Sequence, residues 1–191
     1  MEIPVSKPLF SIGIKDPVLL TDPDARLRRD LCINLLCEIL FSRAGEFYSE
    51  LFEQGIITPG FAYGYSSTET FAFTCLSGES DEPQRVLKLL KDYLARVCAE
   101  GLDREDFERC RRAMYADELR AYDSTEDIAS RLLVFVFDGT QMFSCPDVLQ
   151  SITKEELEAL LPSLFEDGLF SLSVITPLDT TDSNFQKGDL I

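Results

Sequence analysis

The side chains that could carry out chemistry in this sequence are carboxylates, thiols, amines, guanidinium groups and phenols, because none of the 191 residues is a histidine. Histidine is the usual general base of Ser–His–Asp and Cys–His catalysis, and it supplies ligands in the H-E-x-x-H zinc motif and in its inverted form, H-x-x-E-H. The sequence excludes these sites within this chain. We therefore expect no catalytic, metal-binding or cofactor-binding residues here.

The cysteines are the remaining candidates for metal binding. A zinc site made of cysteines usually brings its ligands in closely spaced pairs such as C-x-x-C, and the sequence has no such pair. Several of these cysteines fall at apolar positions of expected helices or strands, where a free thiol packs as a small hydrophobe. We expect reduced thiols, no metal site and a cytoplasmic location, since residues 1–4 do not begin a secretory signal. The six are Cys32, Cys37, Cys75, Cys98, Cys110 and Cys145.

Two groups of charged residues could form an active site, and both are better explained as solvated helix faces. Glu46, Glu50 and Glu53 share one side of an expected helix by their spacing, where carboxylates could act as acid and base. We expect them to face solvent instead, with Arg43 as a supporting charge. A second cluster combines basic with acidic residues and indicates an outer face rather than an anion site: Arg109, Arg111 and Arg112 with Asp106, Glu108 and Asp117.

The charge balance excludes several classes of partner. The chain has 18 basic and 34 acidic residues, a net charge of −16, whereas nucleic-acid binding needs a basic surface. No apolar run has the length of a membrane span, and residues 60–64 lack the spacing of a phosphate loop. We expect no nucleic-acid or membrane partner. The acidity could steer basic peptides, although solubility is the simpler explanation.

The elements that must position any site follow from the apolar periodicity. Alternating apolar residues predict strands at residues 8–15, 61–65, 71–75 and 169–176. Helical periodicity predicts helices at 24–54 with a break at Gly45, at 84–99, at 103–121, from Ser124 onward, and at 153–164. Residues 132–137 are apolar on nearly every side, which predicts a buried helix. The order favours an α+β fold whose antiparallel-rich sheet has helices packed on one face, in a single domain at 5–177 with a polar tail at 178–191.

An ordered set of short segments resembles a known family. The segments are F-S-I-G-I-K at 10–15, E-I-L-F-S-R at 38–43, E-F-Y at 46–48, L-F-E-Q-G-I at 51–56, F-E-R-x-x-R at 107–112 and D-S-x-E-x-I-A at 123–129. In this order they resemble the second half of insulinase-type (pitrilysin and mitochondrial-processing-peptidase-like) zinc peptidases, in the bacterial zinc-peptidase branch. The resemblance covers about residues 5–177.

The resemblance implies a fold and a division of labour. Family members pair two similar α+β halves, of the LuxS and processing-peptidase type, into a chamber. The first half carries the inverted zinc motif, and the second closes the chamber and helps to hold extended peptides. Some members use an Arg and Tyr pair of the second half, but Tyr63, Tyr65 and Arg43 do not match that spacing clearly. We expect both tyrosines to pack on the sheet.

Three hypotheses stay open on the sequence. In the first, the chain is the non-catalytic C-terminal domain of such a peptidase, with zinc only in the catalytic half, which lies in the same chain or in a homologous subunit. In the second, it is a freestanding inactive relative that binds peptides or a partner subunit. In the third, it is an enzyme that uses carboxylates, or a cysteine with a lysine.

Overall fold

The computed structural model describes residues 2–3, as backbone only, and residues 6–177. One sheet is formed by β1 (Glu2–Ile3), β2 (Leu9–Lys15), β3 (Ala62–Ser67), β4 (Ala72–Glu79) and β5 (Phe170–Pro177), in the order β1-β5-β2-β4-β3. The pairs β2–β4, β2–β5 and β3–β4 are antiparallel, and β1 runs parallel to β5. The predicted α+β class is confirmed. The predicted tail at 178–191 lies outside the described residues.

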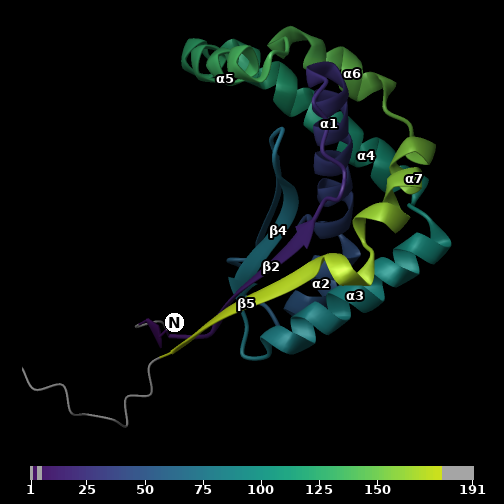
Figure 1. The fold of residues 1–191 in the computed structure, drawn as a ribbon. Helices are drawn as coiled ribbons and strands as arrows, with labels where there is room; N and C mark the ends of the chain where they lie inside the picture. The colour runs from purple at the N-terminus through teal and green to yellow at the C-terminus, as the bar shows by residue number, and fades with distance from the viewer. Residues whose placement is uncertain (1, 4–5, 178–191) are drawn as a thin grey trace, which may run out of the picture.

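The helices gather on one side of this sheet (Figure 1). The helical region predicted at 24–54 with a break at Gly45 is two helices, as expected, because the chain turns between Phe41 and Gly45 before it resumes. A short helix after Cys145 was not predicted, since it spans too few residues to show a periodicity. The helices are α1 (Pro23–Phe41), α2 (Glu46–Glu53), α3 (Pro83–Glu100), α4 (Arg104–Arg120), α5 (Thr125–Asp138), α6 (Cys145–Ser151) and α7 (Lys154–Leu164), with short 3₁₀ turns η1 (Ala121–Asp123), η2 (Met142–Ser144) and η3 (Asp167–Leu169).

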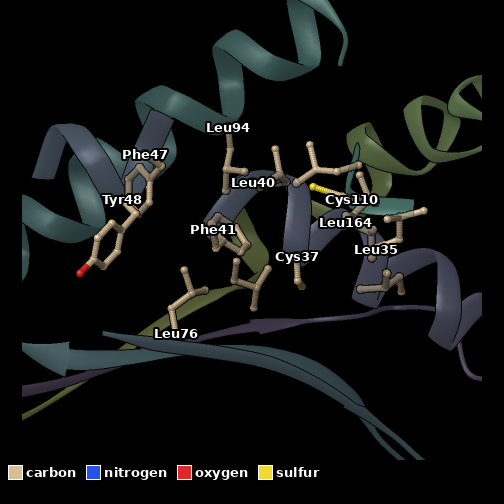
Figure 2. Packing of buried hydrophobic residues seen from close by; sticks show 14 of the residues in the cluster. Leu35, Cys37, Leu40, Phe41, Phe47, Tyr48, Leu76, Leu94, Cys110 and Leu164 are labelled. Atoms are coloured by element: carbon tan, nitrogen blue, oxygen red, sulfur yellow. The ribbon is translucent and has the colours of Figure 1, made fainter. Parts of the chain in front are cut away.

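Helix α1 occupies the centre of the core. Figure 2 shows Cys37 and Phe41 of α1 above the sheet, with Leu76 of β4 beneath them and Leu94 of α3 on the other side. The helix begins where the Asp22 side chain accepts a hydrogen bond from the Ala25 amide and Pro23 takes the first helical position. Its side chains are buried over several turns, so α1 binds the sheet to the outer helices.

The prediction that residues 132–137 form a buried helix is wrong in its burial. Helix α5 forms there, but Val136 is 63% exposed and Phe137 is 86% exposed, and only Phe135 of this run packs against the core. An apolar run of residues indicates that burial of these side chains is favourable, but it does not indicate whether the same chain or another protein buries them. In the described residues, no element covers the outer side of α5.

A buried ion pair connects the end of β2 to α1 and β3. Arg29 donates two hydrogen bonds of 2.8 Å to the Asp16 carboxylate, and the Tyr65 hydroxyl donates a third of 2.8 Å. Burial acts to raise the pKa of Asp16, but the hydrogen bonds from Arg29, the Val18 amide and Tyr65 outweigh it, so that pKa lies below its ordinary value of 3.8. This network has no periodic signature, and the sequence did not indicate it.

We predict that Asp16→Asn lowers the free energy of unfolding by about 3 kcal/mol, because it leaves the buried Arg29 charge without its partner. Urea unfolding at neutral pH measures this change. The ionisation of Asp16 stabilises the fold fully above its unfolded pKa of 3.8, and this stabilisation is lost as pH falls through the lower folded pKa. The difference in free energy of unfolding between wild type and variant should therefore be constant above pH 3.8 and become smaller below it.

The matched control for this variant is Asp81→Asn. Asp81 pairs with Lys7 at 3.5 Å, but its side chain is 72% exposed, so the change should stay within about 0.5 kcal/mol. A loss of similar size in both variants would contradict the role given to the buried pair.

Candidate functional site

The sheet face opposite the helices is uncovered in the described part of the chain (Figure 1). On β2, the apolar residues Phe10, Ile12 and Ile14 point toward the helices, so the residues between them point to the uncovered side. The strand register sets these intervening residues side by side in two rows across four strands. Every member of the rows is small: Ser173, Ser11, Ser77 and Ala62 in one row, and Ser171, Gly13, Cys75 and Gly64 in the other.

These rows form a floor of small side chains without charge. The Ser11 hydroxyl and the Cys75 thiol lie 3.3 Å apart, and the Ser171 hydroxyl donates to the Gly13 carbonyl at 3.3 Å. A side chain at Gly13 would place its Cβ only 2.9 Å from the Ser171 oxygen, so glycine keeps the two strands close. Larger residues stand at the ends of the floor, with Phe73 at one end. Such a floor lets an extended backbone approach the sheet closely.

The edge of the sheet beside this floor is strand β3. In the described sheet, β3 pairs with β4 on one side and has no strand on the other, so one row of its backbone groups is available to a further strand. The pairing of β3 with β4 stops at Ala62 and Ser77. Beyond that point the chain diverges around a cavity of about 620 Å³, whose lining includes Pro59, Gly60, Gly78 and Glu79.

Tyr63 and Tyr65 point to the helix side of β3, away from the floor, and both pack against the core as predicted. The Tyr63 hydroxyl donates a hydrogen bond of 2.6 Å to the Glu38 carboxylate. Burial, the larger cause, and this hydrogen bond, the smaller one, both raise the pKa of Tyr63. Burial and the bond to Asp16 raise the pKa of Tyr65 in the same way. Both phenols therefore remain protonated, and each donates its hydrogen bond to a neighbouring carboxylate.

Arg43 and Tyr63 line the same small cavity of about 430 Å³ on the helix side. Arg43, however, donates to the Pro59 carbonyl at 3.0 Å, and Tyr63 is bonded to Glu38. The structure thus brings these two residues near one another, but not onto the sheet face where an extended peptide could lie. It gives them no role in chemistry on that face.

The two charged groups lie on solvated helix faces, as predicted. Glu46, Glu50 and Glu53 are all exposed. The supporting charge is Arg96 of α3, which binds Glu46 at 2.9 Å, and not Arg43 as the sequence suggested, because the Arg43 guanidinium donates to the Pro59 carbonyl instead.

The second charged group is held by local ion pairs along α4. Arg109 pairs with Asp106 at 2.6 Å, and Arg111 pairs with Glu108 at 2.8 Å. Arg111 also donates to the carbonyls of Gln150 and Ile152, which ties α4 to the end of α6. These contacts give the arginines a structural role.

The thiols are mostly buried and weakly acidic. Burial raises the pKa of both Cys32 and Cys37 to about 12, so neither forms a thiolate near neutral pH. Among residues 6–177, no three cysteine, aspartate or glutamate side chains are grouped so that they could hold a metal ion. The described residues therefore do not fit a zinc site.

Comparison with known proteins is consistent with this arrangement. Residues 19–114 match the model of the family described as the peptidase M16 inactive domain. The chain is 27% identical over 157 residues to the uncharacterized zinc protease YmfH of Bacillus subtilis, a match that covers 82% of this chain and 36% of that protein. The chain thus spans little more than a third of this relative's length.

Solved structures share the fold. An M16-like peptidase from Alicyclobacillus acidocaldarius superposes with a TM-score of 0.83 at 24% identity, over 92% of this chain and 42% of the other. The inactive peptidase domain of a zinc protease from Bordetella parapertussis superposes with a TM-score of 0.78 at 14% identity, over 100% and 99% of the two chains.

The class of protein that these comparisons define is the inactive domain of M16-type peptidases, and the one-sided α+β sheet is the fold of its solved neighbours. This chain belongs to the peptidase M16 inactive-domain family. The resemblance to the second half of insulinase-type peptidases is therefore confirmed.

We predict that thiol labelling of the native chain at pH 8 modifies Cys98 first, since Cys98 is the exposed cysteine, whereas Cys75 is partly covered and the other four are buried. Rapid labelling should disappear in Cys98→Ser, and all remaining thiols should react once the chain is denatured. Mass spectrometry of timed samples gives the order. Fast modification of Cys32 or Cys37 would contradict the burial and raised pKa described above.

Proposed function

We propose that this chain is the non-catalytic half of a zinc-dependent peptidase, and that its uncovered sheet face forms one wall of the chamber in which a separate H-x-x-E-H half cleaves extended peptides. The observation that carries the proposal is the eight-residue floor of small side chains on the uncovered face of an inactive M16 domain. A sheet normally buries its apolar face and leaves the other polar, but a floor built only of small residues also leaves room for a chain lying across it.

The proposed contribution to proteolysis is binding and positioning. An extended peptide could add to β3 as a further strand and form backbone hydrogen bonds that do not depend on peptide sequence. Holding the scissile bond in place lowers the entropic cost of reaching the transition state. Zinc, held by the other half, would activate the attacking water. We also propose a reducing, cytoplasmic compartment, which the six free thiols support.

The proposal predicts that the catalytic half needs this chain. The H-x-x-E-H half, encoded in the same reading frame or beside it, should cleave an unstructured fluorogenic peptide at least tenfold faster with this chain than without it. Chelation of zinc should abolish the activity, and this chain alone should be inert. Full activity of the catalytic half alone, or the absence of any such half, would contradict the proposal.

A variant of the floor separates peptide binding from assembly. Ser173→Phe places a large ring on the uncovered face at an exposed strand position, where an aromatic side chain suits the sheet. We expect it to reduce kcat/KM of the assembly about tenfold while the two halves still associate. The matched control, Lys88→Phe on the exposed side of α3, should leave cleavage unchanged. Equal effects of the two variants would show that the floor has no special role.

A further inference from the structure

Helix α5 and the turn η2 present an apolar surface with no covering element in the described residues. We define the α5 patch as Leu132, Leu133, Val134, Val136 and Phe137 of α5 with Phe143 of η2, whose exposed fractions run from 43% to 86%. Together they expose on the order of 600 Å² of apolar surface, the upper end of what a monomeric protein leaves in water. A specific interface buries about 800 Å² on each partner, so the patch is large enough to form the centre of one.

Polar and backbone contacts fix α5 in place while its apolar side chains point outward. Arg131 pairs with Glu118 of α4 at 2.6 Å. At the C-terminal end of α5, Arg26 of α1 donates to the Asp138 carbonyl at 2.9 Å, and Gly139 closes the helix with a positive φ of 73°. The carbonyl contact and the left-handed glycine fix where the helix ends. The α5 patch is therefore held at a defined position on the domain.

The position of α5 indicates which surface covers it. In Figure 1, α5 extends past β4 to the side away from α3 and α7, which is the side of the uncovered sheet face. The sheet floor and helix α5 thus lie on the same side of the domain (Figure 1). Two relatives of this chain are more than twice its length, since it spans 36% of the Bacillus subtilis protein and 42% of the Alicyclobacillus acidocaldarius chain, whereas the Bordetella parapertussis domain is about as long as this chain.

From these observations we infer that the α5 patch is the docking surface for the catalytic half of the peptidase, packed against apolar side chains of that half. The inference rests on the proposed function and adds to it the contact that holds the two halves together. Polar groups at both ends of α5 would then form the rim of the interface around an apolar centre.

A lipid surface is a less suitable occupant. No single helix among residues 6–177 is long and apolar enough to cross a membrane, but the segments Thr125–Asp138 and Met142–Ser151 pass that test together, with a bend of 98° between them. The second segment carries Met142, Cys145 and Leu149, each at most 1% exposed in the core. A span would pull these side chains out of the domain, and the net charge of −16 would repel anionic lipids.

The test places a photoreactive benzoylphenylalanine at Phe137 of the protein in its native cells, followed by irradiation and mass spectrometry of the crosslinked peptides. We expect Phe137 to crosslink to the half that carries H-x-x-E-H. Substitution at Lys88 on α3 provides the matched control and should give no such product. Chelator-sensitive peptidase activity of the same purified assembly reports separately on the proposed function.

The possible outcomes distinguish the two claims. A crosslink from Phe137 to a second copy of this chain, to lipid or to an unrelated protein would overturn the inference, as would a yield no greater than at Lys88. If the assembly is nevertheless an active zinc peptidase, the proposed function stands and only the docking surface is wrong. If no chelator-sensitive activity accompanies the chain, the proposed function fails and the inference fails with it.

Discussion

The packing of helix α1 against one face of the sheet is the interaction on which the remaining structure depends. Its side chains Leu35, Leu36, Leu40 and Phe41 are at most 1% exposed and lie between the strands and the outer helices. Each fully buried side chain of this size contributes about 2 kcal/mol through removal of apolar surface from water. Because α1 covers the sheet centre, α2, α3, α4 and α7 pack around it on the same side.

This one-sided arrangement leaves two surfaces for function. The face of the sheet away from α1 is composed of small, uncharged residues, and α5 projects beyond the sheet on that same side (Figure 1). A protein that needed only to be a stable domain would gain by covering both surfaces. The sheet face and α5 lie on the same side of the domain (Figure 1). This is explained most simply if the proposed catalytic half packs on that side and a peptide is enclosed between this domain and that half.

The strands and most helices could be predicted because their apolar residues recur with the period of the element. Phe10, Ile12 and Ile14 alternate, and the actual strand β2 matches the expected one closely. The exposure of α5 could not be predicted, because an apolar run does not indicate whether other elements of the same chain cover it. The Asp16–Arg29 pair also escaped prediction, because two single charges in different elements carry no periodic signal. The floor of small residues was hidden for a different reason: serine, glycine, alanine and cysteine have no common pattern until strand register sets them in rows.

Hydrogen–deuterium exchange of the assembled halves, with zinc removed and an uncleaved peptide bound, tests the central claim most directly. If the peptide lies across the floor and adds to the sheet, amides of β3 should exchange at least tenfold more slowly with peptide than without it, because new backbone hydrogen bonds protect them. Amides of α2 and α3, on the far side of the domain, should be unchanged. Protection confined to the catalytic half, with β3 unaffected by the peptide, would contradict the account.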